Sequence, residues 1–163
     1  MKTKLIIALC LLFTCLNILA ADSNSTPHFN ITFTVNKDWG KPEYREYTSI
    51  NKKHELTYQQ KYATLYIIET LCDNCKPVTV KEVNAINEHP QSGIVAMITT
   101  IDSNPAIYQL HSSPKGVDSR QVRFFHNKRF YEIQLTVNRK ADIATHIRFE
   151  RYFFKLLNSV KTK

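Results

Sequence analysis

Two cysteines separated by two residues are the side chains in this sequence with the clearest potential for chemistry. Cys72 and Cys75 enclose Asp73 and Asn74 and directly follow a predicted strand. Thioredoxin-like enzymes also place such a pair after a strand, but their first cysteine begins a helix, whose dipole lowers the pKa of the thiol. Here the first helix-start signal comes at Thr79. We therefore predict a structural disulfide, with a thiol-disulfide oxidoreductase as the alternative function.

The rest of the sequence offers no recognised catalytic or metal-binding pattern. The six histidines show no metal-ligand spacing, and a zinc site at the cysteine pair would need two further ligands. With only three glycines, the chain has no phosphate-binding loop, no dinucleotide fingerprint and no G-x-S-x-G elbow. We expect no catalytic residue, no metal and no cofactor, and we favour a non-enzymatic protein.

Positive charge is concentrated in the last third of the chain. The whole sequence has a net charge of +8, and residues 111–163 carry 12 Lys and Arg against 4 Asp and Glu. This asymmetry favours an anionic partner, namely phospholipid head groups, a polysaccharide or an acidic protein surface, with nucleic acid disfavoured. The alternative is an ordinary solvated basic surface. The candidate anion-binding residues are Arg120, Arg123, Lys128, Arg129, Arg148, Arg151 and Lys155.

The elements that must position these residues are mostly strands. Alternation of apolar and polar residues predicts strands over 29–35, 44–50, 55–60, 62–71, 93–101, 106–111, 121–125 and 129–137. The strand over 62–71 is the strongest candidate for a central position. Thr79 and Glu82 have the spacing of a capping box, which predicts a short helix that ends before His89.

The chain is predicted to close with a long amphipathic helix over 141–160. Its apolar residues occupy half of the circumference, a stripe wide enough to cover a sheet. They are Ile143, Ile147, Phe149, Phe153, Phe154, Leu156, Leu157 and Val160. We therefore expect an α+β fold class: a single domain with an antiparallel β-sheet, a short helix after the central strand and a long C-terminal helix packed on the sheet.

The first 21 residues have the order of a secretory signal peptide. Lys2 and Lys4 precede an apolar run over residues 5–16, and small residues follow at Ala20 and Ala21. The run is shorter than the roughly 20 residues of a membrane-spanning helix, so no transmembrane segment is expected in the mature protein. We predict cleavage after Ala20 or Ala21, a domain over 22–163, and a secreted or periplasmic location.

The order of elements resembles the Mog1/PsbP family. Three segments carry the resemblance: the opening strand and its turn tryptophan over 33–39, the late hairpin over 123–133, and the helix end over 153–160. The resemblance implies an exported, non-enzymatic binding or assembly module. Together with the signal peptide it favours a secreted bacterial factor that acts on a host or a surface, with a basic C-terminal face for its anionic partner.

Overall fold

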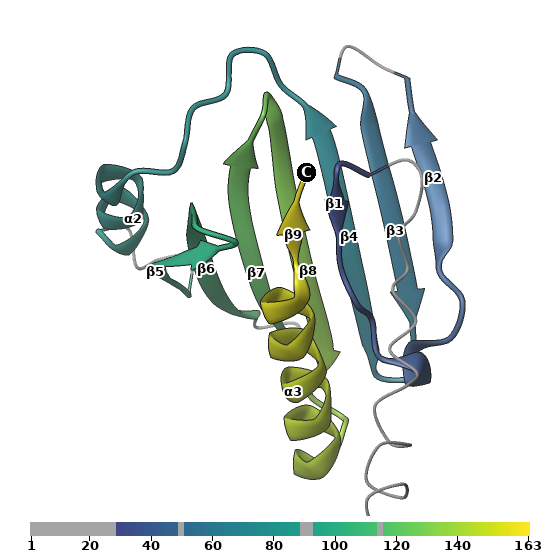
Figure 1. Ribbon diagram of the computed structural model, residues 1–163. Coiled ribbons are helices and arrows are strands. Elements are labelled where there is room, and N and C mark those ends of the chain that lie inside the picture. Colours follow the sequence, from purple (N-terminus) through teal and green to yellow (C-terminus); the bar gives the residue numbers. More distant parts are fainter. Residues whose placement is uncertain (1–28, 49–50, 89–92, 114–115) are drawn as a thin grey trace, which may run out of the picture.

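Seven strands form one antiparallel sheet, in the order β2-β3-β4-β8-β7-β6-β5 (Figure 1). The computed structural model describes residues 29–48, 51–88, 93–113 and 116–163, so the predicted signal peptide lies outside the described residues. The strands are β2 (Glu43–Tyr47), β3 (Lys53–Gln59), β4 (Ala63–Leu71), β5 (Ile94–Ile101), β6 (Asn104–Ser113), β7 (Val117–His126) and β8 (Arg129–Asn138). The predicted central strand, β4, lies inside the sheet between β3 and β8.

Two tight hairpins set the register of the half of the sheet that contains β5 to β8. Asp102 and Ser103 connect β5 to β6 with φ values of 46° and 69°, and Asn127 and Lys128 connect β7 to β8 with 47° and 57°. Two-residue loops with both residues in the left-handed region match the right-handed twist of the flanking strands. The hairpins therefore fix which side chains of these four strands share a face.

Alternating side chains give the sheet one apolar and one more polar face. On β8 the side chains of Tyr131, Ile133 and Leu135 are fully buried, whereas Glu132 and Gln134 between them are half-buried on the other face. The buried side pairs with Leu65 and its neighbours on β4. This face carries the main hydrophobic core.

The elements that pack on the apolar face of the sheet differ from the expected fold class. Strands account for 50% and helices for 22% of the described residues, so the fold is β-rich and the predicted α+β class is wrong. The physical reason is that helix α3 (Ile143–Ser159) buries only part of its apolar stripe. The segment 29–39 contributes its own buried side chains, including Trp39, to the same core.

The strand pairing of this covering segment spans only two residues. The predicted strand over 29–35 is reduced to β1 (Ile31–Thr32), because its partner is the two-residue strand β9 (Lys161–Thr162) at the chain end. A 3-10 turn, η1 (Lys37–Trp39), follows. In Figure 1, β1, β9 and α3 lie together in front of the sheet.

Helix α2 (Val80–Asn87) packs on the opposite face, beside β5. Its predicted capping box is confirmed: the Thr79 hydroxyl accepts from the Glu82 backbone N–H, and the Glu82 carboxylate accepts from the Thr79 N–H. At the other end, the side chain of Asn87 donates to the Ala96 carbonyl and accepts from the Ala96 N–H, both at 2.9 Å. Asn87 thereby satisfies the N–H and the carbonyl of Ala96 on the edge strand β5, which would otherwise be open to pairing with another strand.

A buried carboxylate joins the covering segment to the sheet. Glu69 on β4 is fully buried; it accepts a hydrogen bond from the Arg129 guanidinium at 2.7 Å and one from the Asn30 backbone N–H at 2.7 Å. Burial of a charge is costly unless the charge is paired and hydrogen-bonded. Glu69 therefore requires both Arg129 and the correctly placed start of the covering segment.

We predict that Glu69→Ala lowers the free energy of unfolding by about 3 kcal/mol, because it leaves the half-buried Arg129 without its partner. Urea denaturation measures this loss. The matched control is Glu43→Ala, which removes an Arg–Glu pair whose side chains are 55% and 60% exposed and should change stability little. Equal losses in the two variants would contradict the assigned role of Glu69.

Candidate anion-binding surface

The structure separates the two arginines of β7. Arg120 lies on the apolar face and forms an ion pair with Glu150 of α3. Arg123 lies three residues later and so projects from the opposite face, where it lines a pocket beneath α2. The two residues therefore cannot contribute to one surface, although the sequence analysis named both as candidates for the same anion-binding face.

Two further candidates lie where the β7–β8 hairpin turns. Lys128 is highly exposed, and its Nζ is 4.0 Å from Oδ1 of Asp73. Arg129 is bound to the buried Glu69. Arg129 therefore stabilises the buried Glu69, and Lys128 lies beside Asp73 of the loop that carries the disulfide.

The remaining three candidates lie together on the exposed side of α3, as predicted from their spacing. Arg148, Arg151 and Lys155 are all exposed, and they line a shallow hollow of about 430 Å³ with Ile147 and Tyr152. A second hollow of about 400 Å³ shares Tyr152 and Lys155 with the first. The two hollows form one continuous surface along the helix.

The second hollow adds a cation that the sequence analysis did not select. Lys37 of η1 lines it, and the covering segment brings this residue beside the helix. Within the described ranges, none of the four cations Lys37, Arg148, Arg151 and Lys155 forms an ion pair. We call these four, with Ile143 and Ile147, the α3 surface.

Aromatic packing and a hydrogen bond hold η1 against α3. The rings of Trp39 and Phe149 are 5.0 Å apart between centroids, and the Tyr152 hydroxyl donates to the Asp38 carboxylate. That hydrogen bond, with burial, raises the pKa of Tyr152. The position of Lys37 relative to the helix is therefore fixed by its neighbours Asp38 and Trp39.

Carboxylates anchor both ends of the helix. At the start, Asp142 accepts from the Thr145 N–H at 2.6 Å, which is an N-cap. Beyond the end, Asp102 accepts from the Thr162 backbone N–H at 2.8 Å and from Lys161 Nζ at 3.1 Å. The backbone hydrogen bond from Thr162 is the main cause that lowers the pKa of Asp102 to about 2.

Three apolar residues depart from the predicted stripe. Ile143, Ile147 and Phe154 were expected to face the sheet, but they are 79%, 43% and 46% exposed. Ile143 lies one turn before Ile147 on the same side of α3, so both flank the arginines. The three residues lie along one edge of the wide stripe, and the helix buries Phe149, Phe153, Leu156 and Leu157 instead.

The cysteine pair lies in a loop and not at the start of a helix. The sulfur atoms of Cys72 and Cys75 are joined in a disulfide within the loop between β4 and α2. The N-cap of α2 is Thr79, four residues beyond Cys75. The Cys72 N–H donates to the Lys128 carbonyl at 2.8 Å, which ties this loop to the β7–β8 turn.

The described ranges contain no group of three or more His, Cys, Asp or Glu side chains that could hold a metal ion. No helix in this part of the chain is long and apolar enough to cross a membrane.

Comparison with known proteins does not assign the chain to a family. No family model matches it, and no curated protein matches it. Among solved structures, it is similar to a protein from Bacteroides thetaiotaomicron VPI-5482, with a TM-score of 0.45 and 9% sequence identity. The match covers 82% of this chain, which spans 45% of the length of that protein.

We predict that replacing both cysteines with serine lowers the free energy of unfolding by only about 2 kcal/mol, because the disulfide closes a very short loop. Urea denaturation measures the loss, and the reduced unaltered protein serves as the control and should match the variant. Failure of the variant to fold would contradict this limited role.

We predict that Asp102→Asn removes an acid-sensitive part of the stability. Because the fold lowers the pKa of Asp102 from 3.8 to about 2, its contribution is complete above about pH 4 and is lost as the pH falls toward 2. Asparagine tolerates the positive φ at this position. The difference in unfolding free energy between the two proteins should therefore narrow from pH 5 to pH 2, and a constant difference would contradict the prediction.

Proposed function

We propose that this protein is an exported, non-enzymatic binding protein that docks on an anionic lipid surface through the α3 surface. The observation that carries the proposal is the grouping of exposed cations with exposed isoleucines: three cations and both isoleucines lie on α3, and the fourth cation, Lys37, lies beside the helix on η1. The predicted signal peptide and the resemblance to the Mog1/PsbP family, whose members act by binding, support export and a non-enzymatic role.

The mixture of charge and apolar surface favours lipid over the other anionic partners. A polysaccharide would satisfy Arg148, Arg151 and Lys155 but would offer little to the adjacent side chains of Ile143 and Ile147. A membrane surface offers both, since phosphate groups lie directly above an apolar layer. Helices that lie in the membrane interface combine cations and large apolar residues in this way.

The magnitudes describe a weak and reversible association. Each Lys or Arg near an anionic membrane contributes about 1 kcal/mol, so four cations correspond to a Kd on the order of 1 mM in accessible lipid. Partial burial of the two isoleucine side chains in the membrane lowers this Kd further. The cationic part weakens as salt is added, because the charges are exposed and screened.

The alternative function, a thiol-disulfide oxidoreductase, gains no specific support from the geometry. In such an enzyme a helix start beside the first cysteine lowers the pKa of the thiol. Cys72 instead lies in a loop, seven residues before the N-cap Thr79. The binding function is therefore the one that we argue further.

We predict that reversing two charges of the α3 surface, Arg151→Glu with Lys155→Glu, weakens binding to anionic vesicles at least tenfold. Co-sedimentation of residues 22–163, which include every described residue, with 7:3 phosphatidylcholine and phosphatidylglycerol vesicles measures the effect. Binding of the unaltered protein should fall between 50 and 300 mM salt and should be absent with pure phosphatidylcholine.

The control variant carries the same change of charge elsewhere, Lys81→Glu with Lys128→Glu, both at exposed positions. It should retain most of the binding. Equal loss in the two variants would show attraction by net charge alone, and unchanged binding of the α3 variant would place the lipid elsewhere; either result overturns the proposal.

A further inference from the structure

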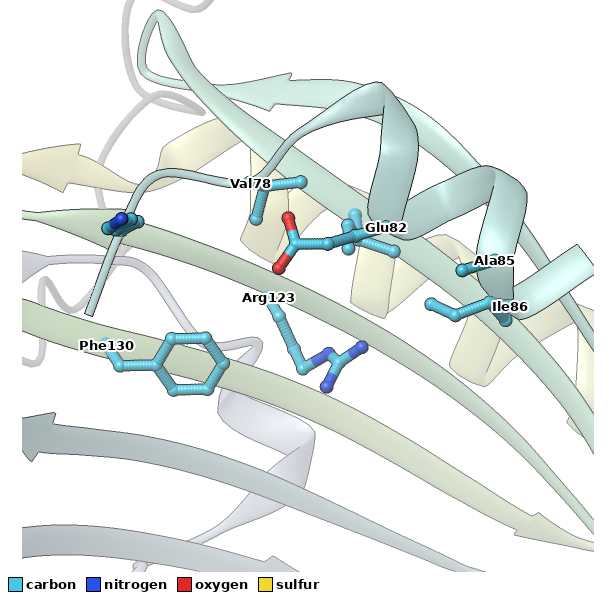
Figure 2. Close-up of a pocket in the computed structure, with 8 residues that line it drawn as sticks. Val78, Glu82, Ala85, Ile86, Arg123 and Phe130 are labelled. Atoms are coloured by element: carbon cyan, nitrogen blue, oxygen red, sulfur yellow. The ribbon is translucent and has the colours of Figure 1, made fainter.

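A pocket lies between α2 and the sheet, on the face opposite to the α3 surface (Figure 2). Its cavity volume is about 280 Å³. The walls come from the loop after the disulfide, from α2, and from β6, β7 and β8. The lining residues are Lys76, Val78, Glu82, Ala85, Ile86, Ile107, Arg123 and Phe130.

The wall formed by α2 is fixed at both ends. The capping box of Thr79 and Glu82 holds the start of the helix, and Asn87 is clamped to both backbone groups of Ala96 at its end. The disulfide before Lys76 restrains the loop that leads into the helix. The pocket is therefore preformed, as small-molecule sites usually are.

Arg123 gives the pocket its chemical character. Its side chain extends into the space beneath α2 in Figure 2, and its Nε is buried without a hydrogen-bond acceptor among the described residues. Glu132 faces it across the β7–β8 pair, yet no ion pair joins them in the described ranges. A buried donor that lacks an acceptor destabilises the folded state, and it does so more strongly when it is charged.

The charges around Arg123 favour an anionic ligand. Lys76 adds a second cation to the lining. The one carboxylate of the lining, Glu82, already accepts from the Thr79 N–H at 2.7 Å and from the Thr79 hydroxyl at 3.0 Å, so it serves the helix cap. Glu132, which faces Arg123 from β8, is not part of the lining. The Arg123 guanidinium forms no ion pair within the described residues, and a guanidinium is suited to a carboxylate, which it can bind through two parallel hydrogen bonds.

The remaining walls are apolar. Ile107 and Phe130 on the sheet face Val78 and Ile86 from the α2 side. At about 30 Å³ for each water-sized group, the cavity holds about nine heavy atoms. We propose that this pocket binds a small organic carboxylate, with the carboxylate on Arg123 and an apolar body between Phe130 and α2.

The proposal is tested by titration of the ¹⁵N-labelled protein, residues 22–163, with hexanoate. The amide signals of Ala85, Ile86 and Ile107 should shift with saturation. Hexylamine and acetate should bind at least tenfold more weakly, because the first lacks the anion and the second lacks the apolar body. These comparisons use the unaltered protein and need no variant.

Variants then locate the ligand. Arg123→Gln should weaken hexanoate binding at least tenfold, whereas Arg151→Gln, which removes a cation from the α3 surface, should not affect it. Equal affinity for hexanoate and hexylamine, or shifts confined to α3, would overturn the proposal. Because vesicle binding uses the opposite face, failure of one proposal leaves the other intact.

Discussion

The two-residue period of the strands decides which charges of this protein can act together. Arg120 and Arg123 are three residues apart on β7, so one meets Glu150 under α3 and the other enters the pocket under α2. The tight β7–β8 hairpin sets the register, so that paired residues of β7 and β8 project from the same face of the sheet. A basic segment that looks continuous in sequence thus supplies a core ion pair, a pocket and an exposed helix face.

Local signals in the sequence predicted local structure well. The capping box at Thr79, the strand that ends before Cys72 and the ridge of Arg148, Arg151 and Lys155 all follow from short-range spacing, and the structure contains each of them. These features depend on residues within one or two turns of each other. Short-range spacing therefore sufficed for them.

Long-range packing explains what the sequence could not predict. The pairing of β4 with β8 joins residues about seventy apart, and Lys37 reaches α3 through packing of its neighbour Trp39. The exposure of Ile143 and Ile147 depends on which part of the wide apolar stripe of α3 packs on the core. The α+β class was wrong for the same reason, because a non-helical segment shares the cover of the core.

If α3 is the element that meets the membrane, as we propose, amide signals of the protein in the presence of anionic lipid nanodiscs will change mainly at residues 143–155 and at Lys37, and added salt will reverse these changes. Changes centred on β2 or on α2, with α3 unaffected, would show that another face binds the lipid.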